Sequence, residues 1–145
     1  MKAMRDAWGE KLVELGKNDP RTVVLDGDLA NSTKADKFAS AHPDLKAVAT
    51  ASAALFVSWP DARGRKVFAD EANWRAEEPL LHTGELRPDT LGVWCGEADP
   101  FLAADRKLVK AVSPAVARFS PGGHKDEYWR GILPDVLAFV GHRLA

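Results

Sequence analysis

The sequence contains one cysteine, no long apolar run and almost no net charge. Cys95 has no second thiol to pair with, so no internal disulfide is possible, and its apolar neighbours predict a small buried residue. The charged amphipathic residues at the start of the chain are unlike a signal peptide or a membrane-spanning helix, and we expect neither. A formal net charge of −1, with acids and bases interspersed, favours neither nucleic acid nor a membrane as a partner. We therefore expect a cytoplasmic protein.

Histidines are also few, and their spacing does not match a metal site. His42, His82 and His142 have no informative context, so we expect them at the surface. We expect neither a metal nor another cofactor. Only His124 comes shortly after the end of a predicted strand, which makes it a candidate site residue.

Short apolar runs, rich in β-branched residues, recur along the chain with segments of helical periodicity between them. Four such runs predict strands at residues 22–26, 46–50, 91–95 and 116–119. Because helical segments separate the strands, they should pair in parallel with right-handed crossovers. The sequence therefore predicts a three-layer α/β sandwich of the Rossmann-like type, a single domain over residues 1–145, with its strands adjacent in chain order.

The other elements are marked by glycine, proline and capping residues. Apolar residues at helical spacing predict a first helix that ends at Gly16, because glycine favours the left-handed helix cap. Residues 51–89 form an irregular segment with one or two short helices. Asp99 followed by Pro100 is a strong helix start, with an acid at the cap and proline in the first turn. In the last helix, Pro134 should introduce a kink or mark the true beginning.

Two strand ends carry an acid and then a histidine. The strand at residues 91–95 leads to Asp99, and the strand at residues 116–119 leads to His124. This is the back half of the Ser…Asp…His order of charge-relay hydrolases, in which the acid orients the imidazole and stabilises its charged form. The front half would be a Gly-x-Ser-x-Gly turn upstream, and this sequence contains none.

Residues 45–145 resemble the α/β-hydrolase superfamily, and within it a bacterial esterase-like branch. The resemblance is carried by KAVATAS at 46–52, WCGEADPF at 94–101, FSPGGH at 119–124 and LPDVLAF at 133–139. It implies that Asp99 takes the position of the triad acid and His124 that of the triad base. It begins just downstream of where the nucleophile elbow would lie, so it implies a truncated hydrolase without its serine.

The first 44 residues are similar to a different family. The similarity is carried by MRDAWGEKLVEL at 4–15, VVLDGDLANST at 23–33, KFA at 37–39 and HPD at 42–44. These blocks resemble the start of the pyrimidine-binding domain of transketolase-type thiamine diphosphate enzymes. In that family, a Gly-Ile-Ala-Glu block further on supplies the glutamate that activates the cofactor, and this sequence lacks the block. Thiamine binding is therefore not carried over.

Together the two resemblances predict a chimera with a junction near residues 44/45. A transketolase-like strand, turn and helix at 22–42 would replace the strand, elbow and helix of the hydrolase, which keeps the packing and deletes the nucleophile. Asp28, near the tip of this turn, could substitute, but it lacks the strained elbow and the oxyanion donors that attack requires. Ser32 is an expected helix cap and Ser52 an expected strand-end residue.

Three functions remain open at this point, and the sequence leaves undecided whether the protein is an enzyme. The leading hypothesis is a recombined α/β-hydrolase-like domain without efficient catalysis, which keeps the Asp99–His124 pair but no serine. The second is a weak or divergent carboxylesterase with a substitute nucleophile. The third is a module that binds a small ligand or oligomerises. The tryptophans Trp59, Trp74 and Trp129 could line an acyl pocket, but core and lid packing is the favoured interpretation.

The last expectation from the sequence concerns self-association of the protein. A whole hydrolase covers the strand expected at 22–26 with further strands, so here that strand would be an exposed apolar edge. We therefore expect a homo-oligomer or a domain-swapped dimer that pairs through this edge.

Overall fold

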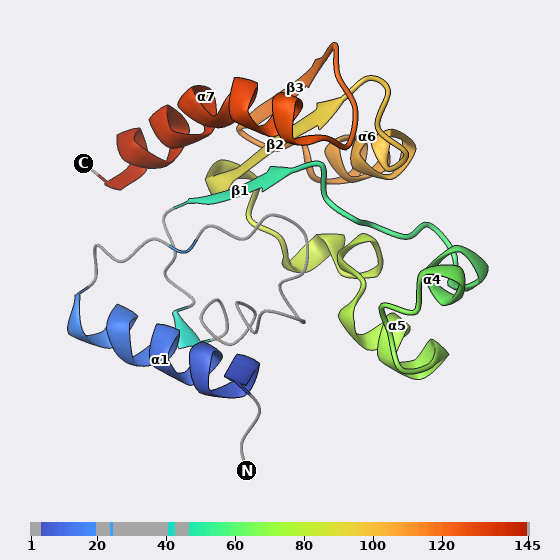
Figure 1. Cartoon of the computed structure of the whole chain (residues 1–145), viewed down its shortest axis with the longest axis horizontal. Helices are drawn as coiled ribbons and strands as arrows, with labels where there is room; N and C mark the ends of the chain where they lie inside the picture. Colours follow the sequence, from blue (N-terminus) through green and yellow to red (C-terminus); the bar gives the residue numbers. More distant parts are fainter. Residues whose placement is uncertain (1–3, 20–23, 25–40, 43–46, 145) are drawn as a thin grey trace.

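The computed structural model describes residues 4–19, 24, 41, 42 and 47–144 (Figure 1). Its helices and strands are α1 (Met4–Asn18), β1 (Val48–Ala51), α4 (Trp59–Arg65), α5 (Glu71–Glu77), β2 (Leu91–Gly96), α6 (Leu102–Val112), β3 (Val116–Ser120) and α7 (Asp126–Leu144). Three short 3-10 helices, η1 (Pro79–Leu81), η2 (Thr83–Glu85) and η3 (Pro88–Thr90), lead into β2.

The three strands form one parallel sheet in the order β1-β2-β3. Val48 pairs with Leu91, and Gly92 pairs with Val116. This arrangement confirms the predicted α/β class, with adjacent strands in chain order and bounds within two residues of those expected. Of the strand expected at 22–26, only Val24 is described, and it belongs to no helix or strand. The rest of that range, and with it the edge expected to mediate assembly, lies outside the described residues.

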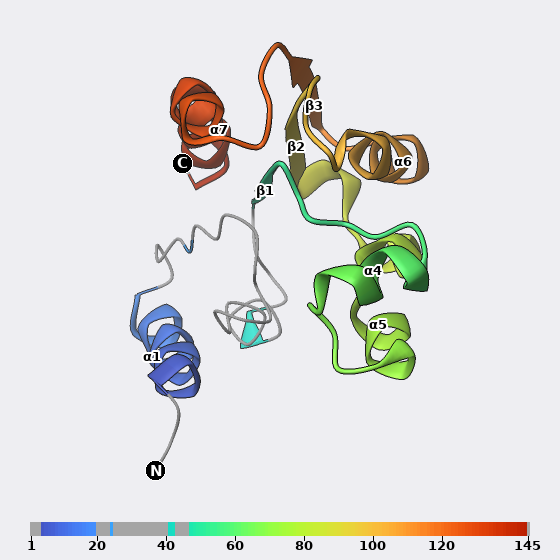
Figure 2. The same cartoon turned by 45° about the vertical axis from the view of Figure 1, so that its right-hand side comes forward.

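The sheet lies between two helices, with α6 on one face and α7 on the other (Figure 2). All six residues of β2 are buried, as expected of a central parallel strand. Side chains of successive residues alternate between the faces. Leu91 and Val93 pack with Leu108 and Val112 of α6. On the opposite face, Trp94 packs with α7 residues Val136, Phe139 and Val140. Cys95 is fully buried, as predicted.

Gly92 is the position that lets the large side chain of Trp94 lie flat against the sheet. A methyl group at Gly92 would come 2.5 Å from Trp94 Cζ3 and 3.0 Å from Phe139 Cε1. The indole, which lies two residues along the same face, therefore occupies the space that a side chain at Gly92 would need. The rings of Trp94 and Phe139 meet edge to face, with their centroids 5.4 Å apart.

Two helix boundaries differ from the sequence-based expectations, and a third decides between the two alternatives left open at Pro134. α1 continues two residues beyond Gly16. α6 begins at Leu102 rather than at Pro100, because residues 99–101 first form a separate turn in which the Leu102 N–H donates to the Asp99 carbonyl. α7 begins at Asp126 and continues through Pro134, so that proline does not mark its beginning. The missing proline N–H costs one helical hydrogen bond, and the buried residues further along α7 offset that loss.

The irregular segment between β1 and β2 contains the short helices α4 and α5, in agreement with the prediction. Its apolar cluster consists of Phe56, Ala62 and Trp74 together with Phe101 from the turn before α6, and Trp59 and Phe68 pack against it. The aromatics of this segment thus build a core of their own, as the packing interpretation expected. Among the residues described, no helix combines the length and the apolar content that a membrane span requires.

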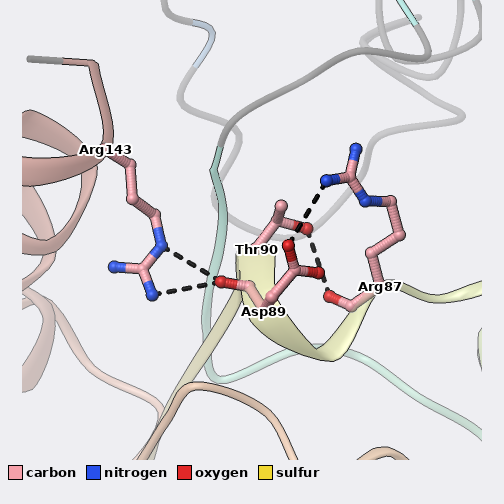
Figure 3. Close-up of polar contacts among 4 residues, drawn as sticks. All are labelled: Arg87, Asp89, Thr90 and Arg143. Atoms are coloured by element: carbon pink, nitrogen blue, oxygen red, sulfur yellow. Dashed lines mark hydrogen bonds and ion pairs between the residues drawn. The ribbon is translucent and has the colours of Figure 1, made fainter.

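Arg143, in the last turn of α7, reaches the backbone just before β2 (Figure 3). Its Nε and Nη2 donate to the Asp89 carbonyl oxygen, at 3.2 and 3.1 Å. Its Cζ lies 3.9 Å from the centroid of the Phe139 ring. The Asp89 carboxylate also contacts Arg87 at 3.4 Å, and Thr90 Oγ1 donates to the Arg87 carbonyl at 3.1 Å. These contacts fasten the end of the last helix to the start of the central strand.

Replacing Arg143 by alanine should lower the free energy of unfolding by about 1 kcal/mol, because the forked hydrogen bond and the contact with the Phe139 ring are both lost. Urea-induced unfolding measures this change. Arg130→Ala on the same helix is the matched control, since Arg130 only forms an exposed pair with Asp126 at 2.9 Å and should change stability by less than about 0.5 kcal/mol. Equal losses in the two variants would contradict the assigned role of Arg143.

Candidate functional site

Asp99 is held in a tight turn directly after β2. Its N–H donates to the Gly96 carbonyl at 3.0 Å, which closes the turn. The side chain is fully buried. Its Oδ1 accepts the Phe101 N–H at 2.9 Å, and its Oδ2 lies 3.1 Å from Nδ1 of His124. One carboxylate oxygen is thus fixed by the backbone and the other faces the imidazole.

His124 reaches Asp99 because two loops approach each other closely. The Ala98 N–H donates to the Gly122 carbonyl at 2.8 Å, which joins the loop after β2 to the loop after β3. Gly96 makes this approach possible, since a methyl group there would lie 2.5 Å from the Gly122 oxygen. Gly122 has a φ of +142°, and a side chain on it would meet the Tyr128 ring. The space at Gly96, and both the space and the backbone conformation at Gly122, therefore require glycine.

Two aromatic rings hold the imidazole of His124. The centroid of the Phe101 ring is 5.4 Å from that of His124, with an interplanar angle of 65°. The Trp129 ring lies at 4.9 Å and 85°. The His124 side chain is 26% exposed, so the ring is packed on its flanks and still reachable by solvent. The sequence offered Phe101 only as part of a block of the hydrolase resemblance and Trp129 only as a possible pocket or packing residue, because their contact with His124 depends on the fold.

A depression of about 560 Å³ lies beside His124. Its lining consists of Ala98, Pro100, Gly122, Gly123, His124, Lys125, Glu127 and Tyr128. These residues come from the loops after β2 and β3 and from the first turn of α7, so the depression lies at the carboxyl ends of the strands. Parallel α/β sheets bind their ligands at this edge.

Asp99 and His124 are called the dyad from here on, and near Asp99 lie two buried groups that could titrate, Cys95 and Tyr128. Burial raises the pKa of the Cys95 thiol far above its ordinary value, and the nearby charge of Asp105 raises it further. Burial also raises the pKa of the Tyr128 phenol above its ordinary value. Both groups are therefore protonated at neutral pH, and Cys95 does not supply a thiolate nucleophile.

Of the three substitute nucleophiles considered, only Ser52 can be placed. It directly follows β1, as expected, with a left-handed φ of +59° and its N–H donating to the Trp94 carbonyl at 2.8 Å. Its side chain is fully buried, so a substrate cannot reach the hydroxyl. Asp28 and Ser32 lie outside the described residues.

The remaining histidines lie apart from the dyad. His142 is exposed on α7. His82 is partly exposed, and its Nε2 lies 2.8 Å from the Arg75 carbonyl. His42 is half-buried, with its Nε2 3.4 Å from the Val13 carbonyl, so it is less exposed than expected. Within the described ranges, no group of three or more histidine, cysteine or acidic side chains is placed to hold a metal ion.

Comparison with known proteins identifies a transketolase-like segment. A stretch of 44 residues, 30% of this chain, is 46% identical to "Transketolase-like protein 2" of Mus musculus. A stretch of 43 residues is 49% identical to "Putative transketolase C-terminal section" of Methanocaldococcus jannaschii. The matched stretches amount to 7% and 14% of those two proteins. No family model matches the chain. The transketolase-like part of the predicted chimera is thus present, and its length is that expected of residues 1–44.

Proposed function

We propose that residues 45–145 are a hydrolase-like unit joined to the transketolase-like segment in a single α/β domain, and that Asp99 and His124 catalyse slow, general-base hydrolysis of small activated esters. One observation carries this proposal. A fully buried carboxylate lies 3.1 Å from Nδ1 of a partly exposed imidazole, at the carboxyl ends of adjacent parallel strands. This geometry is what the acid and base of a charge-relay site require, and it supports the proposal.

The chemistry follows from the orientation of the imidazole. Neutral His124 donates Nδ1–H to Asp99, so Nε2 is the nitrogen that accepts a proton. A water molecule attacks the ester carbonyl while Nε2 removes its proton, and the buried carboxylate stabilises the imidazolium that forms. The tetrahedral intermediate then collapses, and the proton passes from Nε2 to the departing alkoxide. The acid and the alcohol are the two products.

The rate of hydrolysis should be low because no suitable nucleophile lies beside His124 among the residues that the structure describes. The sequence contains no Gly-x-Ser-x-Gly turn, the Ser52 hydroxyl is buried, and the Cys95 thiol stays protonated. General-base assistance alone contributes roughly 10²–10⁴-fold over the uncatalysed reaction. The proposed activity therefore lies well below that of an esterase that forms an acyl-enzyme.

Hydrolysis of p-nitrophenyl acetate and butyrate tests the proposal. The wild-type protein should give a rate above the buffer, and His124→Ala should return it to the buffer value. Asp99→Asn should lower it strongly, because the amide leaves the imidazole poorly oriented. His142→Ala is the matched control and should leave the rate unchanged.

Two results would contradict this function. Equal rates for the wild type and His124→Ala would show that the dyad is a structural remnant without activity. Stoichiometric labelling by a fluorophosphonate, or a burst of p-nitrophenol, would show a covalent intermediate and hence a working substitute nucleophile, which is the divergent carboxylesterase of the second hypothesis.

A further inference from the structure

We propose that Arg65 forms an anion subsite beside His124, so that the site takes esters that bear a free carboxylate in addition to the scissile bond. This inference rests on the proposed hydrolytic function. The subsite lies on the α4 side of the dyad, where the irregular segment meets the turn before α6.

Arg65 is placed close to the dyad by Phe101. Its Cζ lies 5.2 Å from the centroid of the Phe101 ring. The same ring meets the imidazole of His124 at a centroid distance of 5.4 Å. Phe101 is buried, and Phe56 packs against it at 5.8 Å. A single, firmly packed aromatic ring thus links the guanidinium of Arg65 to the imidazole.

The guanidinium of Arg65 retains its capacity to bind an anion. Within the described part of the chain it has no ion-pair partner. The nearest acid on its own helix, Asp61, accepts the Ser58 hydroxyl at 2.6 Å. Both oxygens of Asp99 are occupied by the Phe101 N–H and by His124. A cation–π contact uses the charge of the guanidinium and leaves its N–H donors available for another partner.

The chemistry of the guanidinium selects the ligand class. Its planar array of donors matches the two oxygens of a carboxylate, which gives a forked pair. Lys125, directly after His124, lines the depression beside the imidazole and adds a second positive charge, whereas Arg65 approaches the imidazole from the Phe101 ring and is not part of that lining. Glu127 also lines it and opposes an anion. Two cations against one anion favour a negatively charged group near the imidazole.

A pair of esters with equal acyl length tests the preference. The ratio of kcat/KM for 4-nitrophenyl hemiglutarate to that for 4-nitrophenyl pentanoate should be above one in the wild type. Arg65→Gln should lower this ratio by roughly five-fold, the size expected of a solvent-accessible ion pair. Arg63→Gln is the matched control, since it removes the same charge from an exposed position of α4, and it should leave the ratio unchanged. Glu127→Gln should raise the ratio.

Binding of glutarate separates this inference from the hydrolytic function. Titration of the full chain with glutarate should shift the His124 ring signals in NMR spectra, and Arg65→Gln but not Arg63→Gln should weaken the binding by about the same factor. If no ester is hydrolysed but this pattern is found, the hydrolytic function fails and the anion subsite stands. If Arg65→Gln and Arg63→Gln bind glutarate equally, or if neither they nor the wild type bind it, the subsite is overturned.

Discussion

Replacing Gly96 by alanine should lower the free energy of unfolding by about 1–3 kcal/mol and reduce the His124-dependent activity by up to roughly 10²-fold. The new methyl group would lie 2.5 Å from the Gly122 oxygen and 2.7 Å from the Gly122 carbonyl carbon. These are backbone atoms, so the clash cannot be relieved by rotating a side chain. The loop after β3 must move away, which breaks the hydrogen bond from the Ala98 N–H to Gly122.

Loss of that hydrogen bond bears directly on the dyad. His124 follows Gly122 by two residues, so the position of this loop against the turn after β2 sets where the His124 backbone lies relative to Asp99. A displacement of about 1 Å at a catalytic group reduces rates by up to roughly 10²-fold. The hydrolysis rate of the Gly96→Ala protein should therefore fall further than its stability alone would suggest.

Gly131→Ala is the matched control for this variant. Gly131 lies within α7, and a methyl group there meets nothing within 4 Å. Alanine in the interior of a helix is about 0.5–1 kcal/mol more favourable than glycine, so this variant should gain stability and keep its activity. Urea unfolding measures the stability of the Gly96→Ala and Gly131→Ala proteins, and p-nitrophenyl acetate hydrolysis measures their activity. A Gly96→Ala protein with wild-type stability and rate would disprove the role assigned to the close loop contact.

The parts of this fold that depend on local sequence could be predicted. The three strands found are short apolar runs, and central β2 is buried on both faces, so its sequence alone identifies it. Asp99 and His124 could be selected because each follows such a run, and parallel neighbours bring their carboxyl ends to one edge. The pairing of the two side chains therefore follows from the topology.

Contacts between distant residues were not predictable in the same way. Nothing in the sequence distinguishes Gly96 and Gly122 from other glycines. Their importance follows from the close approach of their backbones in the folded protein. Phe101 packs against His124 and beneath Arg65 only because α4 returns to the turn before α6. The predicted start of α6 failed for a related reason. The Asp99 carboxylate accepts the Phe101 N–H within a turn that precedes the helix, although the same pair of residues is typical of a helix cap.

Glu78 is another residue whose importance is visible only in the fold. It is fully buried, and its carboxylate accepts the Phe56 N–H at 3.0 Å and the Leu80 N–H at 3.2 Å. These two hydrogen bonds join the chain that leaves β1 to the 3-10 helix η1, which lies far along the irregular segment. Glu78→Ala should lower the free energy of unfolding by about 3 kcal/mol, because two buried N–H groups lose their acceptor. Glu77→Ala, an exposed neighbour, should change it by less than about 0.5 kcal/mol.

The contribution of Glu78 should also depend on pH. Burial raises the pKa of its carboxyl above the ordinary value of 4.5, although the N–H groups of Leu80 and Phe56 pull it back in part. The folded protein then binds this proton more tightly than the unfolded chain does. Stability from Glu78 is therefore fully present below about pH 4.5 and declines as the pH rises through the folded pKa.

Glu78→Gln isolates this effect, because glutamine is close in size and does not titrate. The quantity to follow is the free energy of unfolding of the wild type minus that of Glu78→Gln. It should be largest at acidic pH and should decrease as the pH rises above 4.5. Glu77→Gln, at the exposed neighbouring position, is the matched control. Urea unfolding at a series of pH values measures both. A difference for Glu78→Gln that grows with pH would mean that the two backbone donors outweigh burial, and the carboxylate would then stabilise the fold in its charged form.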